Sequence, residues 1–197
     1  MNILFLGPRH NRMIDFLSRN GDRVHCTDQE ITVDSLDVHW ADFIISYGYR
    51  YIIDDEVLIL FPNQAINLHI SYLPYNRGAD PNLWSFIDNT PKGVTIHYLS
   101  RNLDAGDILA QKMVEPTPND TLRTSYARLT NALEDLFEQV WPKIKNGRQP
   151  SKEQPSGGTL HRKRDRKQVE HLLPMGWDTP VTELTGKVVA VEQGKSV

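Results

Sequence analysis

Short hydrophobic runs alternate with amphipathic segments along the first part of the chain. Residues 3–6 form a continuous run, as in a strand buried on both faces, and further strands are predicted at residues 24–27, 43–47 and 65–69. Between them, Met13, Phe16 and Leu17 recur at helical spacing, and a short helix is predicted before Pro62. Strands that alternate with helices indicate βαβ units. The predicted fold class is therefore α/β, with a Rossmann-like, mainly parallel sheet.

The pattern changes in the second part of the chain. Residues 93–99 alternate between apolar and polar, as a strand does, and residues 108–114 follow as another strand. A stripe of apolar residues from Leu122 to Ile144 predicts one long helix. The main domain is therefore expected over residues 1–147. A linker rich in Pro, Gly, Ser and Lys is expected over 148–158, and a short C-terminal segment over 159–197 should dock on the domain.

Composition excludes several classes of protein. A chain of 197 residues with 39% hydrophobic and 24% charged residues is typical of a globular protein, and its net charge of −3 gives no reason to expect nucleic acid as a partner. The single cysteine, Cys26, excludes an internal disulfide and a cysteine-rich zinc site, and we expect a small buried residue there, not a reactive thiol. No signal peptide and no apolar stretch of about 20 residues is present, which predicts a cytoplasmic protein without a membrane partner.

Candidate chemistry centres on three residues. Asn67 and His69 are two apart on a predicted strand, so their side chains share one face at its carboxyl end, where open α/β sheets place their sites. Asp104 follows on a loop and could orient the imidazole. Considered alone, a histidine at a strand end is more often a structural hydrogen-bonding residue, and an aspartate before Ala-Gly is most often a turn residue.

A set of motifs in fixed order changes that balance. They are Asn-Leu-His-Ile-Ser-Tyr-Leu-Pro at 67–74, Arg-Gly-Ala-Asp-Pro at 77–81, Gly-Val-Thr-Ile-His at 93–97 and Leu-Asp-Ala-Gly-Asp-Ile-Leu at 103–109. Together they resemble the 10-formyltetrahydrofolate-dependent formyltransferases over roughly residues 40–145. The resemblance implies that residues 1–147 form a formyltransferase catalytic domain. It also implies 10-formyltetrahydrofolate as formyl donor and co-substrate, a primary amine as acceptor, no metal, and a catalytic trio of Asn67, His69 and Asp104.

The trio suits this chemistry. When an amine attacks the formyl carbon, the formyl oxygen becomes negative, and donors from Asn67 and His69 can stabilise that charge. Asp104 is expected to hold His69, to favour its charged form and to help take the proton that the amine loses.

The same resemblance implies a folate site that uses backbone groups beside an apolar slot. The matching positions follow the third predicted strand and precede Asp104, and they are Tyr49, Tyr51, Ile52, Arg101, Asn102 and Leu103. Ordinary packing at the sheet edge is the other interpretation of the two tyrosines.

The motif at 75–84 looks closest to the sugar N-formyltransferases, which implies a nucleotide-linked amino sugar as acceptor. The substrate-binding candidates are Arg9, Arg77, Asp80 and Asn82. The basic stretch 161–167 could meet a diphosphate or form a solvated helix start. A βα unit near residues 28–38, which often helps to grip the acceptor in relatives, is short here. A non-catalytic binding module, a formyltetrahydrofolate hydrolase, a formyltransferase for another small amine and a homodimer are left open.

Overall fold

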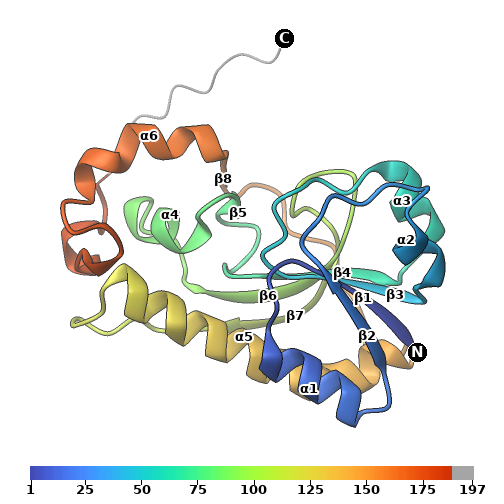
Figure 1. Cartoon of the computed structure of the whole chain (residues 1–197). Coiled ribbons are helices and arrows are strands. Elements are labelled where there is room, and N and C mark those ends of the chain that lie inside the picture. Colours follow the sequence, from blue (N-terminus) through green and yellow to red (C-terminus); the bar gives the residue numbers. More distant parts are fainter. Residues whose placement is uncertain (188–197) are drawn as a thin grey trace.

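A six-stranded sheet forms the centre of the computed structural model, which describes residues 1–187 (Figure 1). Its strand order is β2-β1-β3-β4-β6-β7. The first four strands in this order pair in parallel, whereas β6 pairs antiparallel with both β4 and β7. The sheet is thus mainly parallel, as predicted, with β6 reversed. The strands are β1 (Asn2–Leu6), β2 (Arg23–Thr27), β3 (Phe43–Ser46), β4 (Ala65–His69), β6 (Gly93–Tyr98) and β7 (Ile108–Met113).

Helices cover both faces of the sheet, as the buried apolar strands β1 and β3 require. On one face α1 (Asn11–Arg19) and the long α5 (Leu122–Lys145) bury Phe5 and its neighbours, and on the other face α2 (Leu36–Trp40) and α3 (Asp55–Leu60) cover Leu4 and Leu6 (Figure 1). The βα connection that looked short in the sequence contains the five-residue α2.

The C-terminal segment builds a third hydrophobic cluster on α4 (Pro81–Ile87) and the start of α5. Val169, Val181 and Leu184 share this cluster with Trp84, which is fully buried. A two-stranded sheet of β5 (Arg77–Gly78) and β8 (Leu160–His161) joins the segment to the loop after β4. The remaining elements are α6 (Arg166–Val169) and the 3-10 turns Lys163–Asp165, Glu170–Leu172, Gly176–Asp178 and Val181–Glu183.

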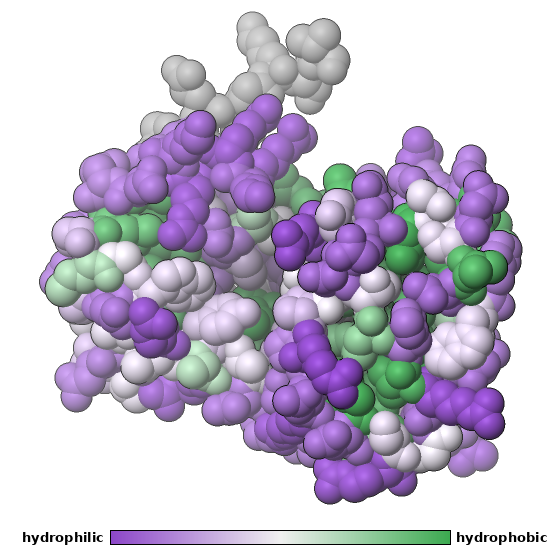
Figure 2. All heavy atoms as spheres, viewed as in Figure 1, coloured by the Kyte–Doolittle hydropathy of each residue, from purple (hydrophilic) through white to green (hydrophobic). Residues whose placement is uncertain are grey.

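The stretch expected to be a linker lies on the domain. Lys152 exchanges two backbone hydrogen bonds with Ile108 at the start of β7. The part of the predicted C-terminal segment at residues 188–197 lies outside the described residues. Within residues 1–187, no helix has the length and apolar character needed to cross a membrane. Figure 2 shows a furrow between the C-terminal segment and the side of the molecule that carries α2 and α3.

Candidate active site

Polar side chains gather at the carboxyl end of β4, next to the apolar core. Asn67 and His69 project to the same face because they are two residues apart. The antiparallel register places His97 of β6 opposite Asn67 and Thr95 opposite His69. Residues that oppose each other in such a pair project to the same side of the sheet. Four polar side chains from two strands therefore share one face.

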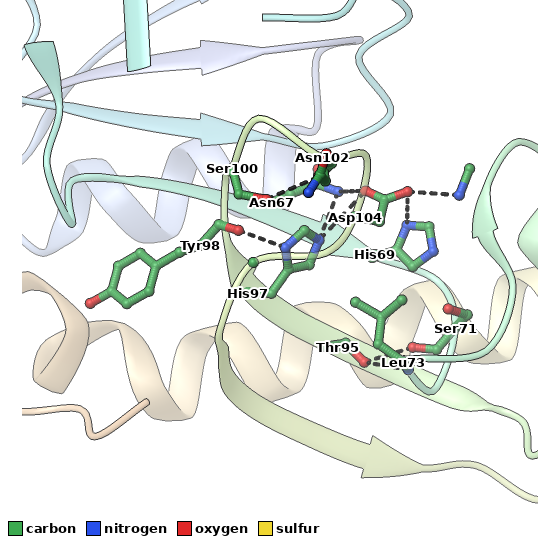
Figure 3. A network of polar contacts seen from close by, with 12 residues as sticks. Asn67, His69, Ser71, Leu73, Thr95, His97, Tyr98, Ser100, Asn102 and Asp104 are labelled. Carbon is green, nitrogen blue, oxygen red and sulfur yellow. Dashed lines mark hydrogen bonds and ion pairs between the residues drawn. The ribbon is translucent and has the colours of Figure 1, made fainter. Parts of the chain in front are cut away.

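The loop between β6 and β7 brings Asp104 onto this face. A side chain at Gly106 would meet a backbone carbonyl oxygen at 1.9 Å, so glycine allows the loop to fold back this closely. Asn67 Nδ2 donates a hydrogen bond to Asp104 Oδ1 at 3.0 Å, and His69 Nδ1 lies 3.7 Å from Oδ2 (Figure 3). The backbone amide of Gly78 donates to Oδ2 at 2.8 Å. The structure thus brings the three predicted residues together.

His97 completes the group, although sequence reasoning named it only within a motif. Its Nε2 lies 3.3 Å from Asn67 Nδ2 and 3.6 Å from Asp104 Oδ1. Its Nδ1 lies 2.8 Å from the carbonyl oxygen of Tyr98, which can only accept, so Nδ1 carries a hydrogen. In the neutral ring, Nε2 then accepts from Asn67, and both amide hydrogens of Asn67 are engaged. Strand alternation with Thr95 was the available signal, but it identifies His97 only once the pairing with β4 is known.

The hydrogen on His69 is placed by the same argument. Nε2 lies 3.0 Å from the carbonyl oxygen of Asn76, so Nε2 carries a hydrogen and donates it. The other nitrogen, Nδ1, faces Asp104. Nδ1 is therefore the atom of His69 that can gain or lose a proton on the side of the site.

Burial and charge oppose each other at these groups. Burial disfavours the ionised form of Asp104, but the charge that His69 carries when protonated, the contacts with His97 and the Gly78 amide hold the pKa of Asp104 well below its usual value. For His69, burial lowers the pKa and outweighs the opposing effect of Asp104. Asp104 does favour the charged ring, as expected, but burial is the larger effect. We infer an ionised Asp104 beside a neutral His69 near pH 7.

Comparison with known proteins identifies the family. A family model described as formyl transferase matches residues 14–140. The chain belongs to the formyl transferase family. The formyltransferase PseJ from Anoxybacillus kamchatkensis is 49% identical, with a TM-score of 0.93 over 95% of this chain and 99% of that chain. Its crystal structure contains UDP-4,6-dideoxy-4-formamido-L-AltNAc and tetrahydrofolate.

More distant relatives share the fold. A 4-N formyltransferase from Francisella tularensis is 22% identical, with a TM-score of 0.72 over 84% of this chain and 78% of that chain. Methionyl-tRNA formyltransferase from Clostridium thermocellum is 17% identical, with a TM-score of 0.65 over 85% of this chain and 74% of that chain. The enzyme therefore has the formyltransferase fold predicted from the motifs.

The residues predicted to bind folate in this formyltransferase lie on two loops: one follows β3, the strand next to β4, and the other carries Asp104. Arg101 Nε lies 3.2 Å from Asp55 Oδ2, which joins the loop before Asp104 to the start of α3. Apolar groups are exposed on both loops, since Tyr51, Ile52 and Leu103 are 36%, 76% and 46% exposed. The loop from 101 to 104 also contains Asn102, whose carbonyl oxygen accepts from Ser100.

Tyr49 has a different environment from Tyr51. Its hydroxyl donates to the carbonyl oxygen of Gln29 at 2.8 Å and accepts from the amide of Ile31 at 3.1 Å. The phenol therefore fastens the segment before α2 to the end of β3. The Tyr49 ring packs against the core on the face covered by α2 and α3 and lies 5.4 Å from the ring of Tyr51, so this tyrosine has a packing role.

The predicted acceptor residues are not grouped in one place. Arg77 adjoins Gly78 beside the trio, and its Nε is buried without a hydrogen-bond partner among the described residues. Asp80 pairs with Arg166 at 3.1 Å. Arg9 donates to Asn11 at the start of α1.

Asn82 lies in the interior, 3% exposed. Its Nδ2 donates to the carbonyl oxygen of Leu122, and its Oδ1 accepts from the hydroxyl of Ser125. Both ends of the amide are thus used to join α4 to α5. Among residues 1–187, no cluster of three His, Cys, Asp or Glu side chains could hold a metal ion.

Proposed function

We propose that this formyltransferase transfers the formyl group of 10-formyltetrahydrofolate to the primary amine of a nucleotide-linked amino sugar. The observation that carries the proposal is the buried group in which ionised Asp104 touches Asn67 and faces the free nitrogen of His69. PseJ, half identical over nearly the whole chain, holds the formylated sugar nucleotide and tetrahydrofolate in its crystal structure, which are the two products of such a transfer.

The exposed apolar side chains on the two loops beside the trio fit a folate. Tyr51, Ile52 and Leu103 offer apolar surface that a pteridine ring could cover. An exposed ion pair between Arg101 and Asp55 connects the loop before Asp104 to the start of α3. The donor would place its formyl carbon at the trio.

In the first step the amine nitrogen bonds to the formyl carbon, and the carbonyl oxygen becomes an oxyanion. The amine must lose a proton, and His69 Nδ1 is the base that we assign to it. Asp104 is a poor base because its pKa is far below its usual value. As Nδ1 takes the proton, the negative charge of Asp104 stabilises the imidazolium.

Asn67 and the charged His69 then stabilise the oxyanion. The Asn67 N–H that donates to Asp104, with a donor–acceptor distance of 3.0 Å, can instead donate a hydrogen bond to the formyl oxygen. The contact with His97 keeps the amide nitrogen of Asn67 turned toward the site. In the second step the intermediate collapses, the bond from the formyl carbon to N10 of the folate breaks, and the proton held by His69 passes to N10. The products are a formamide and tetrahydrofolate.

We assign acceptor recognition to Arg77 and Asp80, which lie in and just after β5, the short strand that pairs with the C-terminal segment. Arg77 is one residue from the amide that holds Asp104, and its Nε lacks a partner among the described residues. A guanidinium in this place could bind an oxygen of the diphosphate. Replacement of Arg77 by Gln should raise the KM for the sugar nucleotide and leave the KM for the folate unchanged.

The decisive experiment measures tetrahydrofolate release from 10-formyltetrahydrofolate with the UDP-linked 4-amino sugar that corresponds to the PseJ ligand. Amine-dependent release and a formylated sugar nucleotide in the mass spectrum are expected. Release of formate without amine would favour a hydrolase. Binding of both ligands without turnover would favour a binding module, and transfer only to other amines would change the acceptor.

The cytoplasmic location stays a prediction from the sequence, as does the homodimer that the sequence leaves open. Cell fractionation would test the first, and sedimentation of the purified protein would test the second.

A further inference from the structure

The stretch after α5 that looked like a linker follows the active-site loop closely. Its backbone is fixed at Lys152, which exchanges hydrogen bonds of 2.7 and 2.9 Å with Ile108. Before this point, Gln149 Nε2 donates to the carbonyl oxygen of Leu109 at 2.7 Å. After it, Gln154 is placed against the loop that carries Asp104. Two glutamines of one segment thus bind backbone carbonyls, but only one of them binds the catalytic loop.

Gln154 spans the turn at Asp104. Its Nε2 donates to the carbonyl oxygens of Asp104 and Gly106, each at 2.8 Å. An amide nitrogen carries two hydrogens, so each carbonyl receives one. Gln154 Oε1, at the other end of the amide, is buried without a hydrogen-bond partner among the described residues. A buried acceptor in that state is unfavourable, which indicates that the two bonds from Nε2 decide the position of the side chain.

The turn that Gln154 spans is one that a non-glycine residue rarely adopts. Asp104 has a φ of 49°, in the left-handed region, which is uncommon for residues other than glycine and which Asn and Asp adopt more readily than most. The direction of the carboxylate depends on this backbone conformation. A small relaxation would move Oδ1 and Oδ2 away from Asn67 and the Gly78 amide.

We propose that Gln154 is a positioning residue of the active site, which holds Asp104 in its left-handed conformation through the carbonyls of residues 104 and 106. The inference rests on the proposed function, because it assigns Gln154 to the same reaction. Gln154 does not touch the reacting atoms. It acts through Asp104, and its loss should lower kcat more than it changes either KM.

The test compares isosteric changes at the two glutamines. Gln154→Glu keeps the shape but turns an ionised carboxylate toward two carbonyl oxygens, whereas Gln149→Glu makes the same change against the carbonyl of Leu109. Gln154→Met removes the hydrogen-bond donor without adding charge, and it tests the same contact if Gln154→Glu does not fold. Each variant is assayed for formyl transfer across pH, and its folding is checked by thermal unfolding.

Gln154→Glu and Gln154→Met should lower kcat by about tenfold to a hundredfold, since a misplacement near 1 Å can cost about 10² in rate. The ratio of the Gln154→Glu rate to the wild-type rate should rise as pH falls, because a protonated Glu can donate one of the two bonds. Gln154→Met should show no such rise, and Gln149→Glu should keep the wild-type kcat.

Equal kcat values for Gln154→Met, Gln149→Glu and wild type would overturn the inference. So would a Gln154→Glu to wild-type ratio that does not change with pH, provided that this variant folds. Absence of amine-dependent transfer by wild-type protein would instead contradict the proposed function, so the two failures are distinguishable.

Discussion

Replacement of Asp104 by Asn removes a charge at the centre of the site and almost no volume. In the wild type, Oδ2 accepts from the Gly78 amide and Oδ1 accepts from Asn67. The amide that replaces the carboxylate has only one oxygen, so its NH2 group must face one of these donors. A buried donor without an acceptor costs about 1–3 kcal/mol, and the variant should be less stable by that amount.

The effect on the reaction follows from the distance to His69. At 3.7 Å, an ionised Asp104 and a protonated His69 attract each other by about 4 kcal/mol if the effective dielectric constant is about 20. That free energy corresponds to about 10³ in rate if it is felt only when the ring is charged, as in the transition state. The amide dipole of Asn retains part of it. We therefore expect kcat of Asp104→Asn to fall by about 10²–10³.

Single-turnover formyl transfer measures this change directly, with folate affinity measured separately by titration. A proton NMR titration of the His69 ring gives the second readout. Asp104 raises the pKa of His69 against the effect of burial, so its loss should lower that pKa further. A variant that turns over at the wild-type rate, or in which the pKa of His69 rises, would refute this account of the charge.

The other predictions concern stability and the residues outside the trio. The pKa of Asp104 is lower in the folded than in the unfolded protein, so its charge stabilises the fold at pH values above about 4. This contribution is lost on acidification. Urea titrations should therefore show that the difference in free energy of unfolding between wild type and Asp104→Asn shrinks below that pH. His69→Gln should lower kcat by about 10²–10⁴ with little change in folate affinity, because the proton acceptor is lost; equal effects on kcat and affinity would contradict it. Cys26→Ser should keep activity, since the half-buried thiol has a pKa raised by burial and touches no reacting group, and loss of turnover in the folded variant would count against the mechanism. A chain that ends at Gly158 should melt at lower temperature and lose kcat, because Trp84 and the loop at 76–79 lose their cover; unchanged values would show that the segment is dispensable.

The centre of the sheet could be predicted because β1 and β3 are short, apolar and buried along almost their whole length. Runs of this kind that alternate with helices are typical of a layered α/β domain. The parallel pairing of β1 to β4 followed from the alternation with helices. The reversal of β6 did not follow from that pattern, because residues 70–92 contain the irregular loop, β5 and α4 between β4 and β6.

The trio could be predicted from motifs, but its neighbours could not. His97 and Asn67 are thirty residues apart, and the sequence does not state the register that places them opposite each other. Gln154 is fifty residues from Asp104 and lies in a stretch whose Pro and Gly content is typical of a linker. Asn82 is the opposite case: it is a polar residue in an active-site motif, but its buried amide hydrogen-bonds α5 and so connects α4 to α5.

The loop after β4 explains why a small C-terminal segment belongs to this catalytic domain. Within a few residues the loop supplies the Asn76 carbonyl that fixes the hydrogen of His69 and the Gly78 amide that binds Asp104. The loop is itself held by Thr159, which accepts from the Asn76 amide through its hydroxyl and from the Arg77 amide through its carbonyl. The short pairing of β5 with β8 thus determines which nitrogen of His69 carries the hydrogen and where the carboxylate of Asp104 lies. Displacement of the segment by about 1 Å would disturb both groups together, which is why its loss should reduce kcat even where the sheet stays folded.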